Sequence, residues 1–425
     1  MSTPASVSLG RLGLLGCESA PGLDTLAIEA ALEEASSVRP LTRESAVALL
    51  RASGRHLLHL LDLASALRDT GKGWTVSFSK KVFIPLTRLC RDRCGYCTFR
   101  RDPGEPEDGF MTPEQVLAIA SAGARVGCKE ALFSLGEKPE LVFPEARRFL
   151  AGRGHRTTID YLASVCQLTL AETGLIPHAN PGTMTIEEMA MLREFNASIG
   201  LMLESVSTRL TQPGGPHHPA PDKHPLLRLR TIEEAGRLRI AFTTGILIGI
   251  GETHQERIDS LFAIKAIHET YGHIQEVIIQ NFRAKPTIPM RAHPEPTLLD
   301  MLRTLAVARL VLGPQMNLQA PPNLTPDAYP LFLLSGINDW GGISPLTKDF
   351  INPEAPWPQI GVLRDGTESF GYRLRERLTI YPEYIVHKEG FIPSTLAPRI
   401  MALVDEAGYP KEERQHGAGA AFHTR

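Results

Sequence analysis

Three cysteines, Cys90, Cys94 and Cys97, lie close together with three and then two residues between them. Cysteine thiolates are the ligands that hold iron–sulfur clusters. Three thiolates bind three irons of a four-iron cubane, and the fourth iron stays open for a ligand that carries an amine and a carboxylate, such as the end of methionine. The spacing therefore predicts a [4Fe–4S] cluster with one open iron.

Two other interpretations of this triplet are weaker. A structural zinc ion needs four closed ligands, and no cysteine or histidine follows at zinc-finger spacing, although His56 and His59 lie upstream. Three unrelated buried thiols are not expected in one loop of charged and glycine residues. The other cysteines, Cys17, Cys128 and Cys166, are scattered, which argues against the dense disulfide framework of a small secreted protein.

The composition is that of a globular protein with a full core. The chain has 425 residues, of which 43% are hydrophobic and 22% charged, and its formal net charge is -2. This balance does not indicate a nucleic acid or a membrane surface as partner, and no apolar run is long enough to span a bilayer. Residues 1–21 lack the basic region of a secretory signal. We expect a tail or a targeting remnant there and a cytoplasmic enzyme, with organelle targeting left open.

Short apolar runs alternate with amphipathic helical stretches from Lys81 onward. Runs that are nearly continuous in apolar residues are typical of parallel strands buried on both faces. The predicted strands are Val82–Leu86, Ala131–Leu135, Leu175–Ala179, Ile199–Leu203, Ala241–Ile248, Val277–Gln280, Met316–Ala320 and a short one at Leu334–Ile337. The helices between them include Thr112–Ala124, Ile186–Phe195, Pro225–Arg239, Gln255–Tyr271 and Leu298–Leu312.

Eight β–α units in one array predict an α/β fold, a (β/α)8 or near-complete TIM-like barrel. The alternative is an open doubly wound sheet. We expect residues 1–75 to form a tail and a helical extension, with a helix over Thr42–Leu67, residues 76–385 the barrel, and residues 386–425 a helical segment and tail. The cysteine triplet follows the first strand, and loops after barrel strands form the catalytic face.

The triplet and its surroundings resemble the radical S-adenosylmethionine superfamily. The resemblance implies that the backbone of Tyr96, just before the last cysteine, contacts adenine. Ser134–Glu137 resembles the Gly-Gly-Glu segment of the superfamily, with a leucine in place of the first glycine. This likeness implies that Gly136 and Glu137 bind the methionine amino group, whereas the plainer interpretation is a strand-to-loop turn.

Two further segments gain a role only through the same resemblance. Glu204 follows the fourth strand, and the likeness implies a contact to the ribose or the ammonium of S-adenosylmethionine; its plainer interpretation is a solvated strand end. Gly249 and Gly251 follow the fifth strand. A lone Gly-x-Gly is weak evidence for a nucleotide site, but in this superfamily the segment lines the adenine pocket.

Polar side chains recur after four of the predicted strands, in His178–Gly182, Gln280–Pro286, Gln319–Leu324 and Asn338–Pro345. Four such segments in register indicate a polar ligand in the barrel. The last three, together with Asn352–Pro358, resemble the ring-closing subunit of the 7,8-didemethyl-8-hydroxy-5-deazariboflavin (Fo) synthase family. This likeness extends over about Lys81–Ile385 and does not cover the first seventy or so residues.

That resemblance implies the substrate 5-amino-5-(4-hydroxybenzyl)-6-(D-ribitylimino)-5,6-dihydrouracil. A [4Fe–4S] cluster, S-adenosylmethionine and an external one-electron reductant would be required, and ammonia, methionine and 5′-deoxyadenosine released. We expect Gln280, Asn281, Asn323 and Asp339 to bind the substrate, without a division of roles, and we assign no catalytic residue. A partner subunit that joins tyrosine to 5-amino-6-(D-ribitylamino)uracil would supply the intermediate.

Three alternatives stay open at this point. The chain could itself be the tyrosine-dependent partner enzyme, which has the same fold and cluster. A sulfur-inserting enzyme like biotin synthase would need ligands for a second cluster, for which Cys128 and Cys166 are too few. A non-enzymatic iron–sulfur electron-transfer protein would not need polar groups at several barrel loops.

Overall fold

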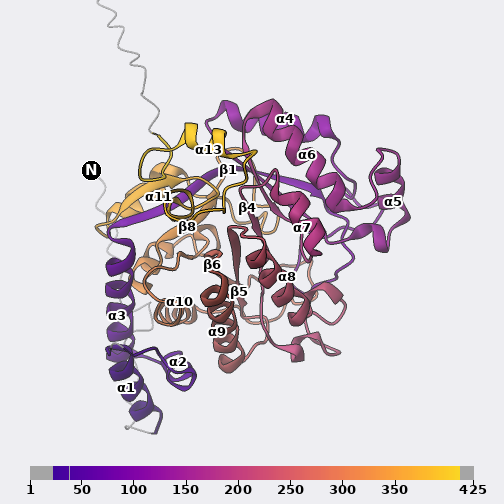
Figure 1. The fold of residues 1–425 in the computed structure, drawn as a ribbon. Coiled ribbons are helices and arrows are strands. Elements are labelled where there is room, and N and C mark those ends of the chain that lie inside the picture. The colour runs from indigo at the N-terminus through magenta and orange to yellow at the C-terminus, as the bar shows by residue number, and fades with distance from the viewer. Residues whose placement is uncertain (1–22, 38, 412–425) are drawn as a thin grey trace, which may run out of the picture.

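The computed structural model describes residues 23–37 and 39–411. The predicted tail at residues 1–21 lies outside this range. All strands join one sheet in the order β2-β3-β4-β5-β6-β7-β8-β1-β9, and β1 also pairs with β2. Eight parallel strands therefore close into a barrel with helices outside it (Figure 1). The barrel prediction is confirmed, and the open sheet is excluded.

The strands are β1 Thr75–Thr87, β2 Glu130–Leu135, β3 Ile176–Asn180, β4 Ser198–Gly200, β5 Phe242–Ile248, β6 Ile274–Asn281, β7 Leu318–Gln319, β8 Asp339–Ile343 and β9 Arg373–Arg377. The α-helices are α1 Leu23–Ala35, α2 Arg43–Leu49, α3 Gly54–Lys72, α4 Pro113–Arg125, α5 Pro144–Ala151, α6 Thr158–Thr173, α7 Ile186–Arg193, α8 Pro225–Arg237, α9 His254–Tyr271, α10 Leu298–Leu312, α11 Ile360–Glu368, α12 Pro382–Val386 and α13 Ala397–Leu403.

Local sequence signals fix where many helices begin. Thr112 and Gln115 form a capping box with a proline in the first turn of α4, and Thr253 and Glu256 form another at the start of α9. Such boxes satisfy backbone N–H groups that have no partner within the helix. All seven residues of β5 are buried, as expected for a strand covered on both faces.

The eighth strand was predicted in the wrong place. The first half of the apolar run at Leu334–Ile337 belongs to a 3₁₀ helix, Tyr329–Ser335, and the strand follows at β8. Phe332 and Leu333 of this helix are fully buried, and Gly336 ends it with a φ of 80°. A short apolar run does not distinguish a strand from a buried helical turn.

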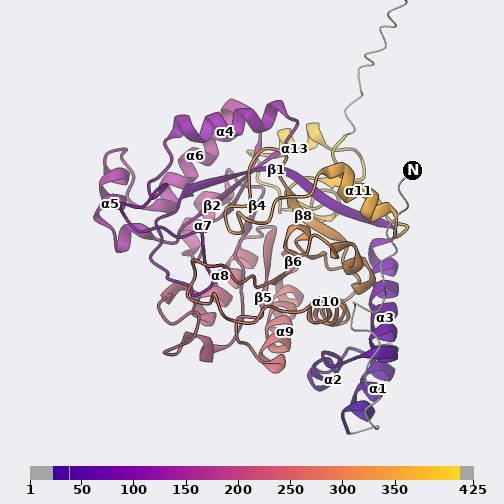
Figure 2. The same cartoon turned by 180° about the vertical axis from the view of Figure 1, so that it is seen from behind.

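The predicted helix Thr42–Leu67 is two helices, α2 and α3, because the chain turns after Leu50 and α3 begins at Gly54 with a φ of 51°. Helices α1–α3 stand along one side of the barrel in both views (Figure 1, Figure 2). The buried Arg68 of α3 donates to the carbonyls of Leu333 and Ile337. This extension is therefore packed directly on the barrel wall.

The chain after β9 covers the barrel at the amino ends of its strands. β9 pairs in parallel with the first residues of β1. Leu378, Ile380 and Tyr381 then pack in one buried cluster with Ile176, at the start of β3, and Ala241, just before β5. This segment forms a floor opposite the cysteine loop. Within the described residues, no helix combines the length and apolar character needed to cross a bilayer.

Candidate active site

A cavity of about 380 Å³ fills the barrel. Its wall includes all three cysteines of the triplet at one end and Arg377 and Thr379 of the floor segment at the other. Strand residues between these ends, such as His178 and Gln280, also line it. One continuous space thus connects the cysteine loop with polar side chains deep in the barrel.

The cysteine loop is held by a second loop, which follows β4. The N–H of Gly95 donates to the carbonyl of Pro216 at 2.8 Å, and the N–H of Arg93 donates to that of Pro219 at 2.9 Å. Cys94 is buried, and Cys90 and Cys97 are partly buried. The thiols therefore come from a loop whose backbone is held by the loop after β4.

The donor set fits an iron–sulfur cluster. Cys90 Sγ accepts a hydrogen bond from the Glu137 N–H at 3.1 Å, as cluster thiolates commonly do. Burial raises the pKa of Cys90 to about 12, so a bound cationic centre is needed to keep this sulfur as a thiolate. Around one tetrahedral zinc ion, sulfurs lie about 3.8 Å apart. In the described part of the chain the three cysteine sulfurs do not all lie within 4.8 Å of one another, which disfavours zinc.

Tyr96 lines the cavity beside the cysteines. Its hydroxyl lies 3.0 Å from His217 Nε2, and its ring packs against an apolar group that includes Leu210, Leu247 and Phe282. An apolar wall of this kind suits a flat aromatic ligand. The expected contact between the Tyr96 backbone and adenine stays a prediction.

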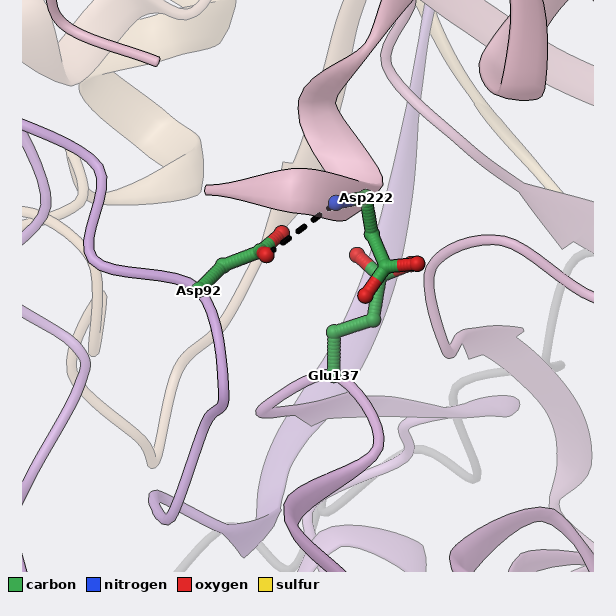
Figure 3. Close-up of side chains that lie close together, drawn as sticks. All are labelled: Asp92, Glu137 and Asp222. Carbon is green, nitrogen blue, oxygen red and sulfur yellow. Dashed lines mark hydrogen bonds between the residues drawn. The ribbon is translucent and has the colours of Figure 1, made fainter. Parts of the chain in front are cut away.

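Three carboxylates, Asp92, Glu137 and Asp222, converge next to the cysteine loop (Figure 3). Each offers an oxygen within 4.8 Å of the others. Asp92 Oδ1 accepts from the N–H of Asp222 at 3.2 Å, whereas Asp92 Oδ2 is buried without a partner. Glu137 passes over Gly182, where a Cβ would come within 2.3 Å of the Glu137 carboxyl carbon.

The cations around this acidic cluster form ion pairs with some of its carboxylates and not with others. Asp222 pairs with both Arg91, at 2.6 Å, and Lys138, at 3.1 Å, and Glu137 lies 3.7 Å from Arg228. Burial raises the pKa of Glu137 to about 7. Since Asp92 has no ion pair among the described residues, the cluster has acceptor capacity for a cationic group of a ligand. Asp92 and Asp222 were not predicted from the sequence.

Glu204 also lines the cavity. Its backbone has a φ of 66°, which is uncommon for a residue other than glycine, and its carboxylate pairs with Lys223 at 2.6 Å. The Glu204 carboxylate lies close enough to Tyr96 of the cysteine loop that its negative charge adds to burial in raising the pKa of Tyr96. Gly136 lies in the wall too, and a Cβ there would overlap the Leu89 carbonyl at 1.9 Å.

Gly249 and Gly251 are not among the residues that line the cavity. Both have positive φ, 86° and 101°, and a Cβ on Gly249 would overlap Pro296 at 2.2 Å. The N–H of Gly249 donates to Glu252 at 2.9 Å. The turn before α9 thus explains these glycines, and their contact with adenine stays a prediction.

Three of the four predicted substrate residues, Gln280, Asn281 and Asn323, line the cavity. Asn323 Nδ2 donates to Asp349 at 3.0 Å and to the carbonyl of Ala355 at 3.1 Å. These bonds fix the side chain, and its Oδ1 is buried without a partner, as is that of Asn281. Both amides therefore offer an acceptor to a ligand.

Asp339 does not line the cavity. It lies fully buried at the start of β8, where its Oδ2 accepts from Arg377 Nε at 2.7 Å. Asp339 thus holds Arg377, which does line the cavity, and its predicted direct contact with substrate stays a prediction.

Comparison with known proteins agrees with this site. Residues 84–264 match the radical SAM superfamily. The chain is 52% identical over 336 residues to the 7,8-didemethyl-8-hydroxy-5-deazariboflavin synthase of Methanopyrus kandleri, covering 79% of this chain and 100% of that protein. It is 49% identical over 387 residues to the FO synthase of Streptomyces avermitilis, covering 89% of this chain but only 45% of that protein.

Solved structures confirm the fold alone. The FeFe-hydrogenase maturase HydG from Carboxydothermus hydrogenoformans superposes with a TM-score of 0.68 at 16% identity, covering 86% of this chain and 81% of that one. Methylornithine synthase gives a TM-score of 0.62 at 20% identity, covering 82% and 97%.

Proposed function

Because the chain belongs to the 7,8-didemethyl-8-hydroxy-5-deazariboflavin (Fo) synthase family of radical S-adenosylmethionine enzymes, we propose that it closes the deazaflavin ring of Fo. The observation that carries this proposal is the single cavity that joins the cysteine loop to polar residues deep in the barrel. The substrate would be 5-amino-5-(4-hydroxybenzyl)-6-(D-ribitylimino)-5,6-dihydrouracil, with a [4Fe–4S] cluster and S-adenosylmethionine as cofactors.

The lengths of the family members support the proposal that this chain catalyses only the ring-closing part of Fo synthesis. The chain spans the whole of the Methanopyrus kandleri synthase but about half the length of the Streptomyces FO synthases that it matches. A separate tyrosine-dependent enzyme would then supply the intermediate. We infer that this partner acts before our chain, and that both work in the cytoplasm with an external one-electron reductant.

The proposed reaction balances without an added oxidant. The cluster and S-adenosylmethionine, when bound, supply a 5′-deoxyadenosyl radical that takes one hydrogen atom from the substrate. A C–N bond forms between the ribityl-bearing nitrogen and the phenol ring, the bond to the C5 amine breaks, and ammonia leaves. The substrate would also lose one proton and one electron, so that overall it is oxidised by two electrons and S-adenosylmethionine is the oxidant. The release of ammonia would make the enzyme a carbon–nitrogen lyase.

The chain's own residues would position both reactants. The triplet Cys90, Cys94 and Cys97 would hold the cluster, and the acidic cluster would accept the methionine ammonium next to it, since Asp92 Oδ2 is free. Asn281 and Asn323 would accept from N–H groups of the pyrimidine. The barrel wall would exclude water, which protects a radical from quenching.

The test is an anaerobic assay with the reconstituted enzyme, the dihydrouracil intermediate, S-adenosylmethionine and dithionite. We expect a fluorescent deazaflavin, released ammonia and no requirement for tyrosine. A cluster-replete enzyme that cleaves S-adenosylmethionine without forming Fo would contradict the proposal. Fo precursor formation from tyrosine and 5-amino-6-(D-ribitylamino)uracil would instead favour the partner enzyme.

A further inference from the structure

The lower half of the cavity carries buried ionic and polar groups for which the radical chemistry has no use. Lys81 pairs with Glu130 at 2.5 Å. Arg377 donates to Glu276 at 2.9 Å and pairs with Asp339 at 2.7 Å. All five side chains are less than a tenth exposed. Lys81, Glu276 and Arg377 line the cavity, so these pairs border the space that a ligand would occupy.

Neutral groups complete this layer, which we call the floor site. His178 lies 3.0 Å from the Thr379 hydroxyl and 3.0 Å from Asn180 Oδ1. Burial lowers the pKa of His178 to about 4, so the imidazole is neutral near pH 7. The Thr243 hydroxyl donates to Glu276 at 3.0 Å. His178, Thr379 and Thr243 all line the cavity, and together they present both donors and acceptors.

The floor site has no excess of positive charge. Two cations, Lys81 and Arg377, face the three carboxylates of Glu130, Glu276 and Asp339. A phosphate group carries a charge of about -1.5 to -2 at neutral pH and would find no unpaired cation here. A chain of neutral hydroxyls, which both donate and accept, matches such a surface. The floor site therefore suits an uncharged polyol.

We propose that the floor site binds the ribityl chain of the substrate in its unphosphorylated form, so that the hydroxybenzyl-pyrimidine end points toward the cysteine loop. The inference rests on the proposed function for the identity of the polyol. The ribose of S-adenosylmethionine is the other polyol in the reaction, but its methionine end belongs at the open iron, at the opposite end of the cavity. Arg377 and Thr379 would make the floor segment part of the substrate site.

Fo itself is the binding probe, because its fluorescence reports binding without turnover. The reconstituted holoenzyme, without reductant and without S-adenosylmethionine, would be titrated with Fo, with the 5′-phosphate of Fo, and with an analogue that carries a methyl group in place of the ribityl chain. We expect Fo to bind at least 10-fold more tightly than either analogue. Equal affinity for Fo and its phosphate would overturn the inference.

Isosteric variants test whether the floor hydroxyls contact the ribityl chain. Thr379→Val and Thr243→Val each remove one floor hydroxyl, and the loss of a ligand hydrogen bond should weaken Fo binding by about 3- to 10-fold while the affinity for the methyl analogue stays the same. The matched control is Thr169→Val, which removes a hydroxyl that is buried without a partner in α6, away from the cavity. Its affinity for Fo should not change. A circular dichroism melt of each variant verifies folding.

Turnover with the dihydrouracil intermediate separates the two proposals. For Thr379→Val we expect the KM for this substrate to rise by the same factor as the Kd for Fo, with a smaller change in kcat. If the wild-type enzyme makes Fo but both floor variants behave like the control, the floor inference fails and the proposed function stands. If the wild-type enzyme makes no Fo, the proposed function fails, and failure to bind Fo overturns the floor inference with it.

Discussion

Replacing Asp92 with asparagine separates ligand binding from folding at the acidic cluster. The new amide oxygen can still accept from the Asp222 N–H, which Asp92 Oδ1 accepts at 3.2 Å. What is lost is the charge on Oδ2, an atom buried without a partner. Burial and the neighbouring Asp222 carboxylate raise the pKa of Asp92, so its charge is costly in the free protein. We therefore expect the Tm of the apoprotein to stay the same or to rise.

The affinity for S-adenosylmethionine should fall, because the ammonium of this ligand loses one charged acceptor. A hydrogen bond that involves a charged group contributes about 1.5–3 kcal/mol, and about 1.4 kcal/mol corresponds to a factor of ten. The Kd should therefore rise by roughly 10- to 150-fold, as measured by calorimetry on the anaerobic holoenzyme without reductant. Asp62→Asn, at an exposed position of α3, is the control and should leave both quantities unchanged.

Two results would contradict the proposed role of Asp92 in ligand binding. A Kd within twofold of the wild-type value, with intact cluster absorbance, would mean that Asp92 does not face the ligand. A lower Tm of the apoprotein with an unchanged Kd would assign Asp92 a structural role instead.

Three further predictions concern the cluster, the floor and the response to acid. Cys94→Ala should lose both cluster absorbance and S-adenosylmethionine cleavage, and retention of both would contradict the cluster assignment. Arg377→Met leaves two buried carboxylates unpaired and should lower the free energy of unfolding by about 3–5 kcal/mol; adding Asp339→Asn should restore part of it, and a melt that shows no such rescue would argue against the pair. The pKa of His273 is lowered to about 3 by burial, so the unfolded state binds more protons below pH 6.5 and stability falls as the pH drops from there. His273→Gln should flatten this fall between pH 6.5 and 4, measured by urea unfolding, and an equally steep fall would count against the assignment.

The strands that build the barrel were predictable because their buried cores are continuous apolar runs. The first residues of these strands were harder to predict. Three of the predicted strands begin at Val82, Ala131 and Val277, each directly after a charged residue. In the structure those charged residues belong to the strands and are buried in ion pairs inside the barrel. A search for apolar residues ends a strand at a charged residue, even when that residue is buried in the strand. A charged residue directly before an apolar run was the feature of the sequence that could have predicted the floor site.

The site depends partly on contacts between distant segments that no local pattern reveals. Arg377 reaches the cavity because β9 pairs with β1, more than 290 positions away in the sequence, and Asp222 meets Asp92 through the loop after β4. The cysteine triplet, Glu137 and Glu204 were predicted from local motifs that follow strand ends, and they line one cavity because loops after barrel strands meet at one face. Asp339 was predicted to lie in the loop after the eighth strand because that strand was placed too early, whereas it is the first residue of β8.

The most direct test of the account is the stoichiometry of a single anaerobic turnover. Reduced holoenzyme would be mixed with the dihydrouracil intermediate and one equivalent of S-adenosylmethionine, and Fo, ammonia and 5′-deoxyadenosine would be quantified together. We expect equal amounts of all three without tyrosine. Formation of 5′-deoxyadenosine with neither Fo nor ammonia would contradict it.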